Sequence, residues 1–157
     1  KAIGAEKKEL AERHVLRREF WMGLLALGKE RGHPHMRVSP SLEMSISAGS
    51  GVSGVSYDYE ILRRGARVVL RIARGDAEAN RRIYEQLHSA RERIEGEMKA
   101  PLEWDHQEGK RRCDVRYQLS EGGLLDRESW PELQERMVDA MVRLVNAIGP
   151  ELRRLKV

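Results

Sequence analysis

The sequence has little of what marks a secreted, membrane-bound or disulfide-stabilised protein. Its one cysteine, Cys113, cannot form an intramolecular disulfide and so indicates a reducing compartment. No apolar run approaches the roughly 20 residues that a membrane-spanning helix needs. The stretch from Lys1 to Arg18 is charged throughout and contains no signal peptide. We therefore expect a cytoplasmic protein with no part in the membrane.

A strong excess of one charge is also missing. The formal net charge is +4, and 29 lysines and arginines are interspersed with 25 aspartates and glutamates. Arginine is abundant, which is typical either of partner binding through the guanidinium group or of a GC-rich genome. Because a dedicated nucleic-acid binder usually carries a basic patch or stripe, this balance favours the second explanation.

The length of 157 residues fits one domain with one continuous core, so we treat residues 1–157 as a single domain. The chain begins with Lys1 rather than methionine. This start suggests the C-terminal fragment of a longer protein, although trimming of the chain would give the same start.

Hydrophobic periodicity defines the expected elements. The pattern predicts helices over 5–31, 76–98 and 129–155, and strands over 44–46, 55–61, 67–72, 102–106 and 113–119. Asp76 is expected to cap the second helix, and Ser129 with Glu132 forms a capping-box pattern at the start of the third. Gly149-Pro150 is expected to kink or interrupt that helix. The predicted fold class is α+β, a mainly antiparallel five-stranded sheet with helices packed on one face, in the order α-β-β-β-α-β-β-α.

Two hairpins have registers that can be predicted. A two-residue loop at Arg64-Gly65 would place Tyr59 opposite Leu70 and Asp58 opposite Arg71. A turn at Glu108-Gly109 would place Trp104 opposite Cys113, Leu102 opposite Val115, and Asp105 opposite Arg112. Both registers put apolar pairs on one face and an Asp-Arg pair on the other, so the outward face is expected to be largely self-neutralised. The remaining basic residues gather at the hairpin tips, where the candidate nucleic-acid contacts are Arg63, Arg64, Arg67, Lys110, Arg111 and Arg112.

Several motifs that suggest a catalytic or ligand site are better explained structurally. The glycine-rich segment 49–54 matches a dinucleotide-binding pattern, but a strand follows it instead of the helix that would receive a pyrophosphate. A kinase-type glycine loop lacks the lysine and the metal-binding motifs it requires. Asp105 with Glu108-Gly109-Lys110 resembles a nuclease metal site, but the second half falls on a predicted turn.

Histidine and cysteine chemistry is not predicted either. His33 and His35 have no partner at metal-ligand spacing, so a loop or surface role is expected for them. Cys113 faces the predicted core, where a thiol is inert. The sequence therefore predicts no catalytic residue, no cofactor and no metal, and we do not expect the chain to be an enzyme on its own.

A set of short motifs resembles one known family. These are Phe20-Trp21, the turn from Gly49 to Gly54, Arg64-Gly65-Ala66-Arg67-Val68, Leu102-Glu103-Trp104, and Trp130-Pro131. From about Arg18 to Leu155 the chain resembles the bacterial and archaeal domain of unknown function catalogued as family 4268. The resemblance implies a position at the C-terminal end of a larger protein, often behind a nuclease-like domain, and it carries no catalytic residues.

The expected function is that of a non-catalytic accessory domain of a larger nuclease- or defence-related protein. It would aid DNA engagement or assembly through its hairpin tips. The alternative is a protein-interaction or dimerisation module with no nucleic-acid role. Expected partners are accordingly DNA, a second copy of the chain or an upstream nuclease-like domain, and none is a membrane.

Overall fold

A computed structural model describes residues 2–106 and 111–156, and it confirms the predicted α+β class. Its elements are α1 (Ala2–Arg31), β1 (Ser45–Gly49), β2 (Val55–Ile61), β3 (Ala66–Ile72), α2 (Ala77–Ser89), α3 (Arg91–Met98), β4 (Glu103–His106), β5 (Cys113–Leu119), a short 3-10 helix η1 (Arg127–Ser129) and α4 (Trp130–Arg153). Among these described residues, no helix combines the length and the apolar character that a bilayer crossing requires.

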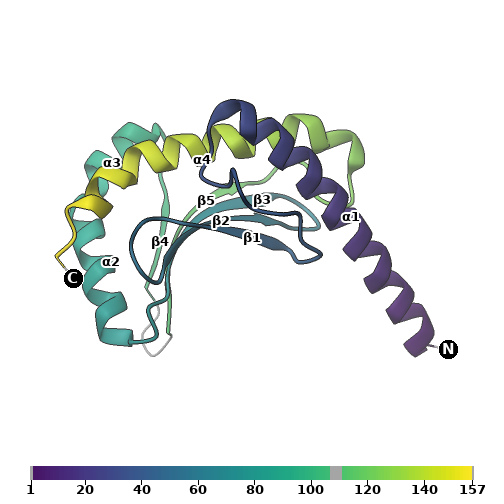
Figure 1. Cartoon of the computed structure of the whole chain (residues 1–157), viewed down its shortest axis with the longest axis horizontal. Coiled ribbons are helices and arrows are strands. Elements are labelled where there is room, and N and C mark those ends of the chain that lie inside the picture. The colour runs from purple at the N-terminus through teal and green to yellow at the C-terminus, as the bar shows by residue number, and fades with distance from the viewer. Residues whose placement is uncertain (1, 107–110, 157) are drawn as a thin grey trace.

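The five strands form one antiparallel sheet in the order β1-β2-β3-β5-β4. Helix α4 crosses one face of this sheet, and the other face curves away from the helices and is left uncovered (Figure 1). The N-terminal half of α1 extends from one end of the arch, while α2 and the hairpin of β4 and β5 stand at the other end (Figure 1). The core lies between α4 and the sheet, where alternate strand residues are fully buried.

The predicted register of the β2–β3 hairpin is wrong by two residues. Tyr59 lies opposite Val68, and Asp58 lies opposite Val69 rather than Arg71. The connecting loop has four residues. Leu62 N–H donates to Gly65 O at 3.0 Å, but the reciprocal bond is missing, because Gly65 N–H donates to Gly122 O and Leu62 O accepts from Leu124 N–H. A shift of two residues keeps every side chain on its predicted face, so the assignment of inner and outer faces is confirmed.

The register of the β4–β5 hairpin is also wrong by two residues. Trp104 lies opposite Val115, His106 lies opposite Cys113, and Asp105 lies opposite Asp114 instead of Arg112. The loop is longer than a tight turn, since β4 ends at His106 and β5 begins only at Cys113. The predicted turn at Glu108-Gly109 falls outside the described residues.

Three predictions about helices need correction. The helix predicted over 76–98 is two helices, because Ala90 leaves the helical conformation and α3 turns toward α4, where Arg93 donates to the carbonyl of Ala147 at 2.7 Å. Ser129 forms no capping box, since its hydroxyl donates to Asp126 O at 2.6 Å. Pro150 does not interrupt α4, which continues to Arg153. The predicted Asp76 cap is confirmed by a 3.1 Å bond from Glu78 N–H.

His33 and His35 lie in a loop, as one of the two expected alternatives has it, but they are not on the surface. They follow α1 in a loop that folds under the helix, and each is only 1% exposed. His33 Nδ1 lies 3.0 Å from the Tyr59 hydroxyl, and His35 Nε2 lies 2.9 Å from the carbonyl of Tyr57. Gly28 leaves room for the His33 ring, which a β-carbon at that position would overlap. The two rings therefore belong to the core, which sequence periodicity cannot reveal for a loop.

The buried histidines make the stability of the fold sensitive to pH. Burial lowers the pKa of both rings, and that of His35 falls to about 4. As pH falls below about 6.5, the histidine rings become protonated in the unfolded chain but stay neutral in the folded chain. The free energy of unfolding therefore decreases progressively down to about pH 4. Chemical denaturation should show that His35 alone lowers the free energy of unfolding by roughly 3 kcal/mol between about pH 6.5 and pH 4.

The control separates His35 from the carboxylates that also titrate there. In His35→Gln the pH dependence of the unfolding free energy should be flatter than in the parent, whereas in His14→Gln it should not change. Equal slopes in His35→Gln and the parent would show that His35 contributes nothing to it.

Candidate nucleic-acid interface

The structure places the predicted contact residues at opposite ends of the sheet. Arg63 and Arg64 lie in the turn that precedes β3, and Arg111 and Arg112 lie just before β5, which pairs with the far end of β3. Seven residues of strand separate the two groups, or roughly 20 Å. The six candidates therefore do not form one surface.

The remaining candidates differ in their surroundings. Arg67 lies within β3 and its guanidinium contacts Glu60 at 2.8 Å, so its charge is already compensated. Arg112 is exposed and only 3.8 Å from Asp114, which is a weak pair. Lys110 lies outside the described residues. Arg63, Arg64 and Arg111 are exposed, and none has a carboxylate of the described residues within ion-pair distance.

The uncovered face of the sheet is held together by Arg71. Its guanidinium contacts Asp58 at 2.7 Å, Glu60 at 2.9 Å and Asp114 at 3.1 Å. Burial alone would lower the pKa of Arg71, but the hydrogen bonds that its guanidinium donates to Asp114 and Glu60 reverse this and raise it. The three carboxylates are almost fully buried because the arginine side chain lies across them.

A second arginine, Arg116, repeats this arrangement beside the first. It contacts Asp105 at 2.8 Å, Asp114 at 3.2 Å and Glu103 at 3.4 Å, and so compensates the two aspartates that oppose each other across the strands. We call this surface the charged face: Arg67, Arg71, Arg112, Arg116, Asp58, Glu60, Glu103, Asp105 and Asp114. Four arginines against five carboxylates confirm the expected self-neutralisation and argue against phosphate binding here.

One end of the sheet has a different balance of arginines and carboxylates. Asn80, almost fully buried, accepts from Arg74 N–H at 2.8 Å and donates to Arg111 O at 3.0 Å, so it fixes the exit of β3 beside the entry of β5. The turn between β1 and β2 meets the same place, since Ala73 N–H donates to Gly54 O at 2.7 Å. The last turn of α4 lies against that turn.

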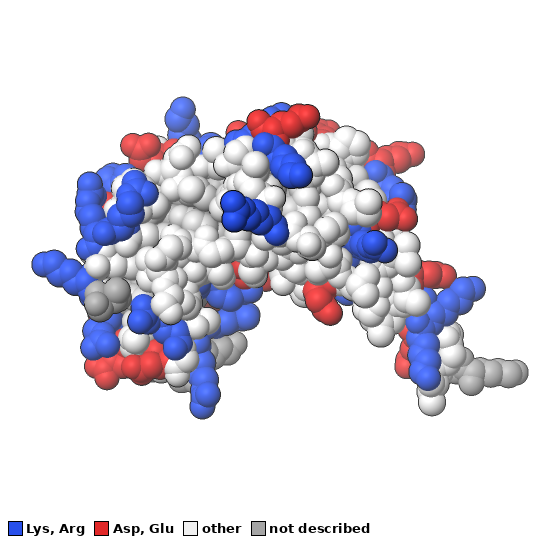
Figure 2. Space-filling model, in the orientation of Figure 1, with Lys and Arg blue, Asp and Glu red and all other residues white. Residues whose placement is uncertain are grey.

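This end carries five arginines from three separate segments, and we call them the basic end: Arg74, Arg111, Arg112, Arg153 and Arg154. Arg154 is paired with Glu151 at 2.9 Å, and Arg112 weakly with Asp114. Within the described residues no carboxylate lies within ion-pair distance of Arg74, Arg111 or Arg153. Figure 2 shows blue side chains gathered around this end, at the left.

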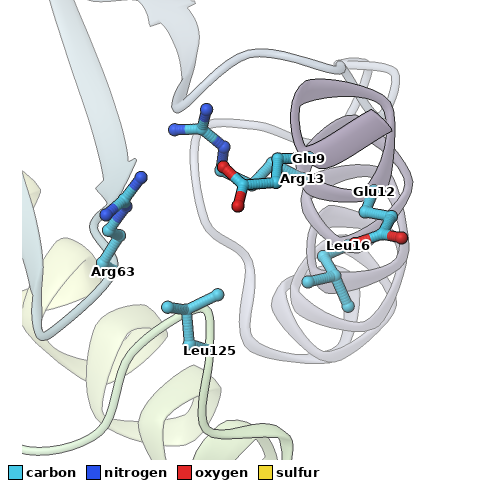
Figure 3. Close-up of a pocket in the computed structure, with 6 residues that line it drawn as sticks. All are labelled: Glu9, Glu12, Arg13, Leu16, Arg63 and Leu125. Atoms are coloured by element: carbon cyan, nitrogen blue, oxygen red, sulfur yellow. The ribbon is translucent and has the colours of Figure 1, made fainter. Parts of the chain in front are cut away.

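The opposite end is more mixed. A cleft of about 260 Å³ lies between α1 and the turn that carries Arg63, and its lining includes Glu9, Glu12 and Arg13 (Figure 3). Two carboxylates therefore accompany the two arginines of this cleft. Their presence weakens any attraction that Arg63 would exert on a phosphate.

The other motifs have structural roles. The segment 49–54 is the turn between two strands, as expected. Asp105 is ion-paired with Arg116, while its proposed partners at 108–110 fall outside the described residues. Cys113 is buried, and burial raises the pKa of its thiol to about 11, so it stays protonated at neutral pH. No group of three metal-ligating side chains occurs in the described part of the chain.

Sequence reasoning missed Arg74, Asn80 and Arg153. A usable signal existed for Arg74, because an antiparallel meander must bring the β1–β2 turn to the end where β3 finishes. Asn80 lies in a helix where its periodicity places it among apolar neighbours, but an amide that bonds two backbones cannot be read from spacing. Arg153 could be assigned to this end only once the end of α4 was known.

Fold and charge together define an α+β structure with an open-faced antiparallel sheet whose outer face is largely self-neutralised. The model of the family described as Domain of unknown function (DUF4268) matches residues 16–152, and the chain belongs to that family. No curated protein and no solved structure matches it significantly.

Proposed function

We propose that this chain is a non-catalytic accessory domain that engages nucleic acid through the basic end. One observation carries the proposal: three segments distant in sequence place five arginines at one end of the sheet, and three of these arginines have no carboxylate partner among the described residues. The bacterial, nuclease-related or defence-related context is part of this proposal and rests only on what the resemblance to the family implies. A nuclease-type Asp and Glu-x-Lys pair encoded upstream would support that context.

Arginine suits this role chemically. Its planar guanidinium donates two parallel hydrogen bonds to a phosphate and keeps its charge at every physiological pH. Such contacts give sequence-independent binding that weakens steeply with salt, because each neutralised phosphate releases counterions. The charged face would not compete, since its arginines are already bonded to carboxylates.

The test is fluorescence anisotropy with duplex and single-stranded oligonucleotides over a range of salt. Arg111→Gln with Arg112→Gln should weaken binding at least tenfold and flatten the slope of log K against log salt by about 2, which corresponds to two lost phosphate contacts. The matched control is Arg63→Gln with Arg64→Gln at the opposite end, which should change affinity little. Absence of salt-sensitive binding by the parent, or equal losses in both pairs, would refute the proposal.

The second candidate is an assembly module, and the long α1 favours it. Residues 3–12 are exposed along their whole length, including Ile3 and Leu10, and this half of the helix extends beyond the body of the domain (Figure 1). An isolated helical segment of this kind is marginal in water unless it packs on something. Light scattering decides: a dimer would support assembly, and a strict monomer at high concentration would count against self-association.

A further inference from the structure

The glycine-rich turn and the end of α4 border a pocket within the basic end, to which the proposed function assigns no particular ligand group. The pocket has a volume of about 450 Å³ and is lined by residues 50–53, Arg74, Leu152, Arg153 and Leu155. We call it the turn pocket. We propose that the turn pocket binds the phosphate group of a phosphate monoester, with Arg74 and Arg153 as the residues that hold it.

The turn that forms one wall is firmly built. The hydroxyl of Ser50 donates to Val55 O at 2.7 Å and accepts from Val52 N–H at 3.2 Å. Gly54 has a φ of +75°, and a β-carbon there would lie 2.6 Å from Cγ of Arg74. Only glycine lets the turn approach the end of β3 so closely, and this approach brings Arg74 beside the turn.

The turn also leaves space for a ligand. Gly51 has a φ of +90°, and a β-carbon built on it would meet no atom within 4 Å. Its backbone therefore borders open space within the lining of the pocket. Backbone N–H groups in glycine-rich turns of this kind are good donors to phosphate oxygens, because no side chain blocks the approach.

The charge of the pocket has one sign. Arg74 enters from the segment after β3 and Arg153 from the last turn of α4, and none of the described residues of the lining is a carboxylate. The guanidinium of Arg153 lies along α4 over Gly149, where a β-carbon would be 3.5 Å from Nη1. It is close enough to Tyr57 to oppose, in part, the rise that burial causes in the pKa of that hydroxyl, to about 12.

The remaining lining is apolar and indicates that the ligand is more than a free anion. Val52 and Leu155 are half-buried, and Leu152 is almost fully buried beneath them. The volume suits a small organic molecule. A phosphate held by two arginines with an organic body against the leucines describes a phosphate monoester, either a free mononucleotide or the terminal phosphate of a strand.

The inference shares the basic end with the proposed function, but its test uses different residues. Binding of inorganic phosphate, adenosine 5′-monophosphate and adenosine is measured by calorimetry, together with an oligonucleotide that carries or lacks a 5′-phosphate. We expect saturable binding of adenosine 5′-monophosphate and at least tenfold weaker binding of adenosine. Arg74→Gln and Arg153→Gln should each weaken the phosphate-dependent binding about tenfold, and Arg63→Gln should leave it unchanged.

The outcomes distinguish a free mononucleotide from a strand end as the source of the phosphate. They also distinguish phosphate binding by the turn pocket from nucleic-acid binding by the basic end. Dependence on Arg74 and Arg153 with the mononucleotide supports a free ligand, and the same dependence only with the 5′-phosphorylated oligonucleotide supports a strand end. Binding that survives Arg111→Gln with Arg112→Gln would uphold the turn pocket even if the nucleic-acid proposal fails. No saturable binding of any phosphate-bearing probe, or binding unaffected by both arginine variants in folded protein, overturns the inference. Amide shifts of Gly51 and Ser53 on addition of phosphate to the parent provide a check that needs no variant.

Discussion

Replacing Arg71 with methionine is expected to lower the free energy of unfolding by about 3–5 kcal/mol, which can be enough to unfold the domain. The substitution leaves Asp58, Glu60 and Asp114 close together and almost fully buried without their shared cation. The loss comes from three desolvated carboxylates that repel one another, not from the missing hydrogen bonds alone. Denaturant unfolding followed by circular dichroism measures it.

Two further variants show whether the charged face is responsible. Arg71→Lys keeps the charge but one ammonium group cannot reach three carboxylates as a guanidinium does, so an intermediate loss is expected. Arg81→Met removes an exposed arginine that pairs with Glu78 and Glu85 on a helix surface, and should cost less than about 1 kcal/mol. If Arg71→Met were as mild as Arg81→Met, the charged face would not contribute to stability.

Replacing Gly123 with alanine is expected to cost about 3 kcal/mol or more. Gly123 has a φ of +154°, which L-residues rarely adopt, and a β-carbon would overlap the carbonyl of Arg63 and lie 2.7 Å from Cα of Arg64. Both obstacles are backbone atoms, so a side-chain rotation cannot relieve them. Because Leu124 N–H and Gly122 O hold the β2–β3 turn, the substitution should disturb that turn first. The measurement is the unfolding midpoint in denaturant.

The matched control for this substitution is Gly96→Ala. Gly96 lies within α3, and a β-carbon there would meet nothing within 4 Å. Alanine is the better helix former by about 1 kcal/mol, so this variant should be as stable as the parent or slightly more stable. A Gly123→Ala protein with unchanged stability would mean that the loop does not pack on the turn as described.

The hairpins show what sequence can and cannot predict in this fold. Period-two alternation correctly assigned the inner face of β2 and β3, because moving a strand by two residues leaves its faces unchanged. It did not predict the register, because loop length is set by contacts to a distant segment, 120–125. The same tertiary packing explains why the second helix breaks at Ala90, although alanine favours helix.

The candidate contacts were predictable as residues but not as a surface. Charge counting found the arginines at both hairpin tips and the self-neutralised face between them. It could not show that the tips lie at opposite ends or that Arg67 is paired. Nor could it place Arg74, Arg111 and Arg153 at the same end of the sheet. Asn80 holds the backbone of Arg74 beside that of Arg111, and the end of α4 brings Arg153 to the pocket that Arg74 lines.

The most direct test of this account is a map of backbone amide shifts during titration with a short oligonucleotide at low salt. We predict that the shifts concentrate in segments 50–54, 73–76, 111–113 and 152–155, which surround the basic end. The part of the charged face around Arg71 and Arg116, and the turn at Arg63 and Arg64, should shift little. Shifts centred on Arg71 and Arg116, or no shifts at any residue, would contradict the account.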